Sequence, residues 1–238
     1  RFLGENVPLS TIITSIDPDS PAMRAGLRAG QQLLTINGHA VVDVLDYRFY
    51  GYDPVSHLTL KNEDGSTRKL TVRKAEGEDL GLNFDTYLMD EMRSCANHCI
   101  FCFVDQMPPG MRQTLYFKDD DARLSFLQGN YITLTNLTER EAQRIIDLRI
   151  SPINVSVHTT DPQLHCTMLG NKNAAKSLDY IRAFCKAGIV MNGQIVVWPG
   201  WNDGDHLRRS IEDLMDIGFH SCSIASRTSA FALTICKA

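Results

Sequence analysis

The sequence lacks any apolar run long enough to cross a membrane and any excess of basic charge. Its 238 residues contain no apolar segment of about 20 residues and no signal sequence of basic, apolar and small residues. The 24 lysines and arginines face 28 aspartates and glutamates, a net charge of −4, so the charge indicates neither nucleic acid nor a membrane surface as partner. We expect a cytoplasmic protein. Because the chain begins at Arg1, we expect its true start to lie upstream.

A disulfide framework is also missing. The seven cysteines are an odd number in a chain that is not small. Four of them stand singly among apolar residues, and we interpret these as small buried hydrophobic residues: Cys166, Cys185, Cys222 and Cys236. The other three form the motif Cys95-x3-Cys99-x2-Cys102. Three thiolates at these spacings fit one iron–sulfur cluster and leave one iron without a protein ligand.

Two other interpretations of the three cysteines remain open. With His98 they would give a Cys3His zinc site, although His98 and Cys99 are adjacent, which makes ligation of one metal by both awkward. A fourth ligand nearby would instead make the cluster an electron carrier. A further interpretation, in which the open iron binds a cofactor, is favoured by Phe101, which stands directly before the last cysteine.

The motif, including Phe101, resembles that of the radical S-adenosylmethionine (radical SAM) superfamily. The resemblance implies a [4Fe-4S] cluster whose open iron is chelated by the amino and carboxylate groups of S-adenosylmethionine, and whose electron breaks the sulfonium bond to give a carbon radical. Phe101 would lie against the adenine. The resemblance also implies an oxidoreductase-like enzyme of unknown substrate and a reducing partner such as a flavodoxin- or ferredoxin-like donor.

The first domain, which we place at residues 1–78, is predicted to be small and rich in β-structure. Short β-rich segments alternate with turns such as Asn37-Gly38. The run from Ser20 to Gly30, with Pro21 behind a capping serine, predicts a short helix. These features resemble a bacterial PDZ domain over about residues 5–76, which implies a peptide or protein partner. The carboxylate-binding Gly-Leu-Gly-Phe pattern is missing from the leading segment, so a docking or shielding role is equally open. Gly81-Leu82-Asn83-Phe84 resembles that pattern but falls after this domain, and we interpret it as the start of the next one.

The second domain, residues 79–238, alternates strands with helices. Strands are predicted near 82–84 and at 130–135, 153–158 and 189–198, and helices after the capping box of Thr138 and Glu141, at 174–187 and at 206–217. Helices between consecutive strands indicate parallel pairing. The overall fold class is therefore α/β, a small PDZ-like domain followed by a partial (β/α) radical SAM barrel, in which chemistry gathers at the C-terminal ends of the strands.

Polar side chains at those strand ends are the candidate site. Strand alternation sends Ser156 and His158 to one face, and Gln194 interrupts an apolar run. The resemblance assigns Ser156 and His158 to the polar end of the cofactor, with His158 also able to move a proton near neutral pH as a catalytic residue.

Three further residues complete the predicted cofactor contacts. Thr135 and Asn136 stand where the superfamily has a Gly-Gly-Glu stretch that receives the cofactor's amino group, but neither carries a charge. Asn202 lies in a Pro-Gly-x-Asn-Asp turn whose simplest role is to cap the following helix.

The sequences flanking the cysteines narrow the resemblance to PDZ-headed radical oxidoreductase-like proteins. Residues 103–112 and 118–126 carry this likeness. Asp119 to Asp121 are expected to form a solvated helix start, and Arg112 and Arg123 to bind an anionic substrate or pair with those carboxylates. After Gly218 the family pattern is lost, so we expect an N-terminal part of a longer member, incomplete through truncation or a shifted reading frame. An inactive barrel behind a PDZ-type binding module is the remaining alternative.

Overall fold

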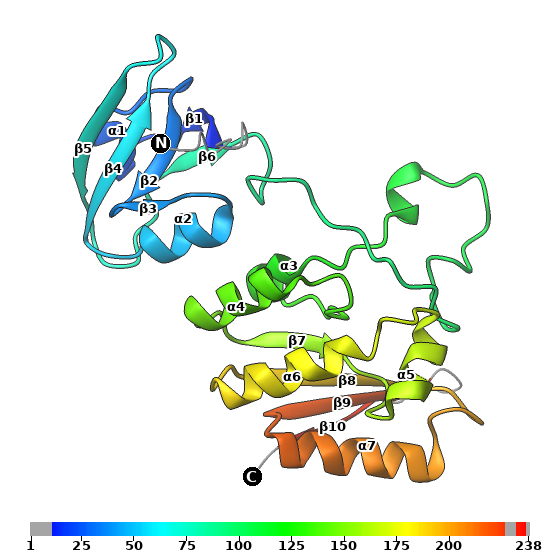
Figure 1. Ribbon diagram of the computed structural model, residues 1–238. Helices are drawn as coiled ribbons and strands as arrows, with labels where there is room; N and C mark the ends of the chain where they lie inside the picture. Colours follow the sequence, from blue (N-terminus) through cyan, green and yellow to red (C-terminus); the bar gives the residue numbers. More distant parts are fainter. Residues whose placement is uncertain (1–10, 227–231, 237–238) are drawn as a thin grey trace, which may run out of the picture. The chain divides into compact units, whose positions relative to one another are not determined.

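The computed structural model describes residues 11–226 and 232–236, and the chain divides into two units, residues 1–92 and 93–238. The first unit contains a four-stranded antiparallel sheet with the order β3-β2-β4-β5 (Figure 1). Its strands are β2 (Gln32–Ile36), β3 (His39–Ala40), β4 (Val55–Lys61) and β5 (Thr67–Arg73). Two helices, α1 (Pro21–Arg24) and α2 (Val44–Tyr50), complete the PDZ-like unit.

Local sequence signals explain the short elements of this unit. Helix α1 begins at Ser20, whose side chain accepts the Met23 N–H, and Pro21 occupies its first turn, as predicted. Asn37 and Gly38 both have positive φ, 52° and 84°, which joins β2 and β3 by the tight turn expected of this dipeptide.

A second, two-stranded sheet alters the predicted domain boundary. Strand β1 (Ile13–Ile16) pairs antiparallel with β6 (Leu82–Phe84). The chain just before β6 is also fixed to the first unit, because the Ala22 N–H donates to the Leu80 carbonyl and the Asp17 N–H to the Gly81 carbonyl.

The prediction that residues 82–84 begin the barrel is therefore contradicted. The partner strand lies far upstream, so no local pattern reveals the pairing. The structural division falls after Met92, whereas the sequence placed the boundary after residue 78.

The second unit has a four-stranded sheet with the order β10-β9-β8-β7. Its strands are β7 (Ile153–Ser156), β8 (Met191–Val197), β9 (Ser221–Ser226) and β10 (Ala232–Cys236), of which the first three are parallel and β10 is antiparallel. Its helices are α3 (Ala122–Gln128), α4 (Glu139–Asp147), α5 (Pro162–Leu169), α6 (Lys176–Lys186) and α7 (Gly204–Ile217), with a 3₁₀ turn at Gln113–Tyr116.

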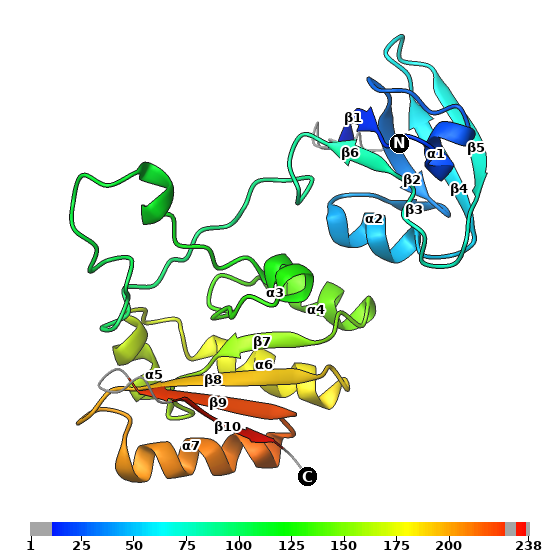
Figure 2. The same cartoon turned by 180° about the vertical axis from the view of Figure 1, so that it is seen from behind.

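These elements confirm the predicted βα rhythm. Helices α6 and α7 connect β7 to β8 and β8 to β9, and both lie beside the sheet in the two opposite views (Figures 1 and 2). The predicted strand 130–135 is reduced to one bridge, in which Ile132 pairs with Val155 at the outer edge of β7. Helix α5 was not predicted.

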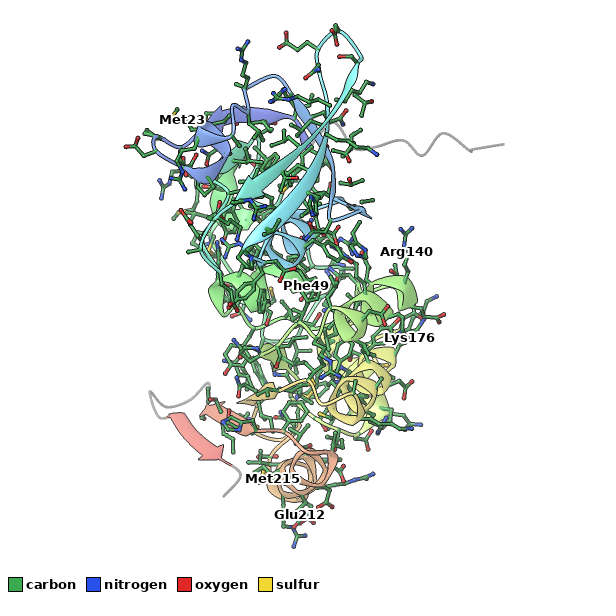
Figure 3. The ribbon with its side chains drawn as sticks, turned by 90° about the vertical axis from the view of Figure 1, so that its left-hand side faces the viewer. Met23, Phe49, Arg140, Lys176, Glu212 and Met215 are labelled. Atoms are coloured by element: carbon green, nitrogen blue, oxygen red, sulfur yellow. The ribbon has the colours of Figure 1, made fainter. Side chains whose placement is uncertain are left out.

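The helices of this unit begin and end where their sequences indicate. Thr138 and Glu141 form the predicted capping box at the start of α4. Gly218 ends α7 in the left-handed conformation. The charged side chains of Arg140, Lys176 and Glu212 are exposed on α4, α6 and α7 (Figure 3). The core lies at the sheet, where Val155 and Ile195 are fully buried.

Part of the tail after Gly218 departs from its prediction. Although the sequence pattern there indicated no strand, Ser221–Ser226 forms β9 and pairs in parallel with β8 over six positions. Phe219 and Cys222 are buried beside it. Residues 227–231 lie outside the described part of the chain. Within the described residues, no helix is long and apolar enough to cross a membrane.

Candidate functional site

The three grouped cysteines lie in one loop without regular structure, and all three are half-buried free thiols. Two backbone hydrogen bonds order the loop: the Cys95 N–H donates to the distant Lys118 carbonyl at 2.6 Å, and the Cys102 N–H donates within the loop to the Cys99 carbonyl at 3.0 Å. Burial, and then the neighbouring thiolates of Cys95 and Cys102, raise the pKa of Cys99 to about 12.

Asn97 anchors the loop from its centre and is almost completely buried, at 1 % exposure. Its amide nitrogen donates to Thr133 Oγ1 at 3.0 Å, and its oxygen accepts from Thr135 Oγ1 at 3.0 Å and from Asn171 Nδ2 at 2.8 Å. These bonds join the cysteine loop to two distant segments. Sequence reasoning missed Asn97, because an asparagine between cysteines carries no local signal of burial.

The end of α5 supports the other side of the loop. The His98 and Ile100 N–H groups donate to the carbonyls of Leu169 and Met168, both at 2.9 Å. Gly170, with φ +58°, lies so close that an added Cβ would be 2.4 Å from the His98 carbonyl oxygen. A glycine is therefore required where the loop passes over the helix end.

Phe101 is the residue through which the cysteine loop contacts the C-terminal ends of the parallel strands. Its ring meets the His158 ring edge-on, with centroids 4.5 Å apart and an interplanar angle of 62°. The Trp198 ring lies 6.3 Å away. His158 follows β7 and Trp198 follows β8. The structure thus brings the cysteine loop to the strand ends where the predicted cofactor contacts lie.

Ser156 and Gln194 are neighbours across β7 and β8. They are paired in the parallel register, and Ser156 Oγ lies 3.5 Å from Gln194 Oε1, the limit of a hydrogen bond. The Gln194 backbone carbonyl accepts the N–H groups of Val157 and His158 at 2.9 and 3.3 Å. The weak side-chain contact leaves both side chains with hydrogen-bonding capacity toward a ligand.

His158 is in an unusual state for a proton carrier. It is 4 % exposed, and its backbone has φ +62°, a left-handed conformation that costs energy outside glycine. Its Nδ1 accepts the Val196 N–H at 3.2 Å, which assigns the proton of the neutral ring to Nε2. Burial lowers the pKa of His158 to about 3. The expectation that it titrates near neutral pH is contradicted, since the buried ring is neutral there.

Asn202 holds the strand ends together. It is fully buried, and its amide donates to the carbonyls of His158 and Val196 at 2.8 and 2.9 Å while its oxygen accepts the Trp198 N–H at 2.7 Å. Asp203, not Asn202, is the residue before α7. The predicted turn thus supplies the cap residue of α7, Asp203, whereas the Asn202 side chain is used between the strands and keeps no donor for a cofactor.

Thr135 and Asn136 lie beside the cysteine loop, as their predicted role requires. Besides its bond to Asn97, the Thr135 hydroxyl lies 2.8 Å from Thr133 Oγ1. The Asn136 amide donates to the carbonyls of Ser94 and Asp120 at 3.3 and 3.0 Å. These contacts place both residues next to the segment that carries Cys95.

Asp120 is the charged group that the sequence analysis did not assign to the site. It is 2 % exposed, and its carboxylate accepts the Thr133 N–H at 2.6 Å and the Thr133 hydroxyl. Burial raises its pKa to about 6, while hydrogen bonds from Thr133 and the nearby Cys95 thiol oppose that rise. Among the residues that the structure describes, no lysine or arginine forms an ion pair with it.

The charged residues next to Asp120 pair with each other. Asp121 begins α3 as predicted, and its carboxylate forms a buried ion pair with Arg123 at 2.7 Å. Asp120 and Asp121 are both buried, so the expectation of a solvated triple aspartate is wrong for these two. Arg123 is thereby paired rather than available to a substrate. Arg112 is exposed.

The donor set fits an iron–sulfur cluster. Three half-buried thiols of one loop supply the ligand type that iron–sulfur clusters take. Over the described range of the chain, no group of three His, Cys, Asp or Glu side chains could hold a metal ion. In an iron–sulfur cluster each cysteine binds a different iron, so the three sulfurs need not meet at one metal ion. The match to a cluster site therefore depends on the residue types and on their position in one loop.

Comparisons with known proteins divide the chain between residues 73 and 74, closer to the boundary predicted from the sequence than to the structural division after Met92. Residues 74–224 match a radical SAM-like domain, and residues 12–73 match a PDZ domain. No functionally curated protein matches the chain. Among solved structures, the crystal structure of a radical SAM methyltransferase from Sphaerobacter thermophilus aligns with 88 % of this chain and 74 % of its own, at 13 % identity and a TM-score of 0.31.

Proposed function

The chain belongs to the radical SAM-like domain family, and from that premise we propose that its second unit binds a [4Fe-4S] cluster through Cys95, Cys99 and Cys102 and uses it to cleave S-adenosylmethionine reductively. When bound, the cluster and the cofactor supply one-electron chemistry that starts a radical reaction on a substrate. The single observation that carries this proposal is the edge-on contact of Phe101 with His158, because it places the cysteine loop at the C-terminal ends of β7 and β8.

The protein's own residues orient the cofactor in this proposal. Phe101 supplies an aromatic surface for the adenine. Ser156 and Gln194 offer hydroxyl and amide groups with unused hydrogen-bonding capacity, and Thr135 and Asn136 line the side nearest Cys95. Asn202 acts through the backbone, since it fixes the ends of both strands. His158 contributes a neutral, packed ring in place of a titrating base.

Asp120 supplies the negative charge that Thr135 and Asn136 lack. A buried carboxylate is stable when it meets a cation or hydrogen-bond donors. Asp120 has donors from Thr133 but no cationic partner among the described side chains, and it lies beside Cys95. We assign it to the ammonium group of S-adenosylmethionine, the group that a Gly-Gly-Glu stretch receives elsewhere in the superfamily.

An external donor must reduce the cluster, and a flavodoxin- or ferredoxin-like protein is the partner we propose. The test is anaerobic reconstitution with iron and sulfide, followed by dithionite and S-adenosylmethionine. We expect stoichiometric cluster and the release of methionine with 5′-deoxyadenosine. A fully reconstituted cluster that releases neither product would contradict the proposed cleavage. The oxidoreductase class and the cytoplasmic location stay predictions.

A further inference from the structure

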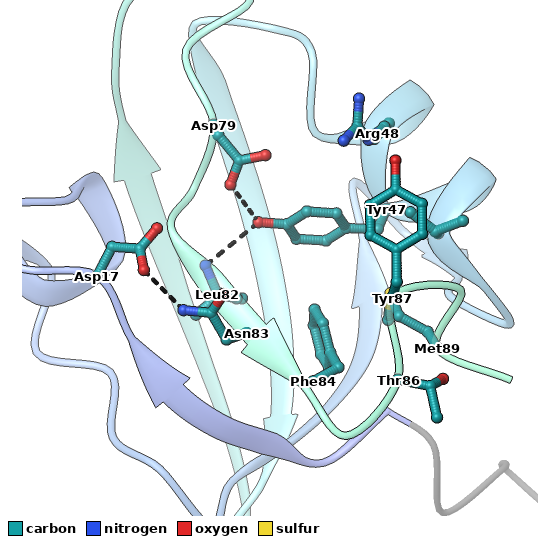
Figure 4. A pocket seen from close by; sticks show the side chains of 11 residues that line it. Asp17, Tyr47, Arg48, Asp79, Leu82, Asn83, Phe84, Thr86, Tyr87 and Met89 are labelled. Carbon is teal, nitrogen blue, oxygen red and sulfur yellow. Dashed lines mark hydrogen bonds between the residues drawn. The ribbon is translucent and has the colours of Figure 1, made fainter. Parts of the chain in front are cut away.

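The first unit contains a cavity of about 260 Å³ between α2 and β6 (Figure 4). It is lined by Asp17, Val44, Tyr47, Arg48, Asp79, Leu82, Asn83, Phe84, Thr86, Tyr87 and Met89. Strand β6 has β1 along one edge. In the described residues no strand pairs along its other edge, where the Leu82 N–H meets the Tyr47 hydroxyl from α2. A cavity between a helix and an open strand edge is a recurrent peptide site.

The loop that leads into β6 has the form of an anion-binding loop. Gly81 has φ +78°, and an added Cβ would lie 2.3 Å from Ser20 Cβ, so only glycine fits there. Gly81 and Leu82 supply two consecutive backbone N–H groups. Consecutive amides in a turn of this kind attract an anion. In PDZ domains this kind of loop receives the C-terminal carboxylate of a peptide.

In this chain the side-chain carboxylate of Asp79 already accepts a hydrogen bond from this loop. The Gly81 N–H donates to Asp79 Oδ1 at 2.7 Å, and the Leu82 N–H donates to the Tyr47 hydroxyl at 3.3 Å, which in turn donates to the same Asp79 oxygen at 2.8 Å (Figure 4). Burial, and then the charge of Asp79, raise the pKa of Tyr47, so the phenol keeps its proton and can donate. The three bonds form one closed set around Asp79 Oδ1.

The chain after β6 forms part of the cavity wall. The Val44 N–H at the start of α2 donates to the Leu88 carbonyl at 3.2 Å, and Val44 and Met89 both line the cavity. The cavity measures only about 260 Å³. The space suits one side chain of a partner more than a strand added along β6.

The charge of the cavity indicates which side chain. Asp17 and Asp79 are exposed, and each uses only Oδ1 in its side-chain hydrogen bonds, Asp17 with Asn83 and Asp79 as described above. Arg48 is the cationic residue of the lining. Against this single cation the two carboxylates leave the lining with a net negative charge, which favours a cation over an anion.

We propose that Asp79 is an internal occupant of the carboxylate loop, and that the cavity therefore binds a basic side chain of a peptide rather than a peptide's free C-terminus. A terminal carboxylate would have to displace Asp79 from two donors and would meet its negative charge. A lysine or arginine side chain would meet Asp17 and Asp79 through their second oxygens. This assignment concerns the first unit alone and holds whether or not the second unit binds a cluster.

The test uses the full chain, immobilised, and pools of acetylated random hexapeptides with lysine or glutamate fixed at the third position. Each pool is made with a free C-terminal carboxylate and with a C-terminal amide, and retained peptides are quantified by mass spectrometry. We expect the lysine amide pool to be retained most and the glutamate pools least. Asp79→Ala should raise the retention of acids relative to amides by about tenfold, since the Gly81 N–H and the Tyr47 hydroxyl become available to the terminal carboxylate. Asp85→Ala, at an exposed aspartate outside the cavity, should change nothing.

Three results would overturn the proposal. One is tenfold or greater preference of the unmodified chain for acids over amides. Another is equal retention of lysine and glutamate pools. The third is no retention of any pool by either the unmodified chain or Asp79→Ala. Asp79→Asn keeps an acceptor for the Gly81 N–H and serves if the alanine variant does not fold; it should weaken the lysine preference without restoring acid binding.

Discussion

Each unit contains a loop beside a glycine that cannot be replaced without a clash, Gly81 in the first unit and Gly170 in the second. The two loops differ in how their polar groups are hydrogen-bonded. In the first unit the Gly81 and Leu82 N–H groups are satisfied by oxygens of Asp79 and Tyr47. In the second unit the backbone of the cysteine loop is anchored, while the Cys95 sulfur accepts a long bond of 3.5 Å from the Asn97 N–H and its thiol interacts with the Asp120 carboxylate. One loop is filled from within, whereas we propose that the other binds a ligand.

The difference shows how a ligand site can be recognised without its ligand. The anchors of the second loop come from residues far along the chain, namely Lys118, Thr133, Thr135, Met168, Leu169 and Asn171. They fix the loop's position without using its thiols. A loop that is ordered by distant residues, yet leaves its most reactive atoms weakly bonded, is organised in advance for binding.

The largest expected effect comes from removing a thiol of the cysteine loop. Cys99→Ser should lower bound iron after anaerobic reconstitution by roughly tenfold or more, because the cluster loses one of its three protein ligands. Cys166→Ser, at a half-buried cysteine outside the loop, should retain the iron. Iron analysis and visible absorbance check both variants. Full iron content in Cys99→Ser would show that the loop is not the cluster site.

A second variant disturbs the cysteine loop without touching a ligand. Gly170→Ala places a Cβ against the His98 carbonyl, whereas Gly188→Ala introduces the same left-handed strain into open space. We expect Gly188→Ala to cost about 1–2 kcal/mol of stability with iron binding intact. Gly170→Ala should cost more and should also lower bound iron. Equal iron contents in the two variants would mean that the end of α5 does not position the loop.

Asp120→Asn tests the role of the carboxylate beside the cysteine loop. In the first unit the corresponding carboxylate, Asp79, is bound by the loop itself. The amide retains an oxygen for Thr133 but no charge for an ammonium group. We expect the dissociation constant of S-adenosylmethionine, measured by equilibrium dialysis on reconstituted protein, to rise about tenfold. Asp119→Asn, at the exposed neighbour, is the control. Unchanged affinity in Asp120→Asn at normal iron content would assign Asp120 a structural role only.

The smallest effect concerns the pH dependence of His158. Its folded pKa of about 3 lies below the value of 6.5 expected in the unfolded chain. The unfolded state therefore binds more protons between these values, so this group leaves stability unaffected above about pH 6.5 and lowers it as the pH falls toward 3. Carbon-detected NMR of the ring should show no titration between pH 5.5 and 8. A His158 resonance with a midpoint near 6.5 would contradict the buried, neutral state.

Local signals carried the sequence predictions that succeeded. Thr138 and Glu141 act on the same helix turn, and Gly218 ends the helix directly before it, so the bounds of α4 and α7 could be read from neighbouring residues. The polarity pattern of 153–158 likewise placed Ser156 and His158 at the end of a buried strand.

The failures depended on distant partners. Residues 82–84 joined the first unit because β1, about 70 residues earlier, completes their sheet. Asn202 and Asp120 each look like solvent-facing turn or helix-start residues in the sequence. Their burial follows from strand ends and a threonine that only the fold brings to them. The charge state of His158 was misjudged for the same reason, since burial by the whole unit sets it.

The most direct test of the account is electron paramagnetic resonance of the reduced, reconstituted protein with and without S-adenosylmethionine. The account predicts a spectrum of one reduced [4Fe-4S] cluster that shifts when the cofactor is added, because the iron without a cysteine ligand binds it. A reduced cluster whose spectrum is the same with and without saturating cofactor would contradict the central claim that the loop of Cys95, Cys99 and Cys102 holds an open iron for S-adenosylmethionine.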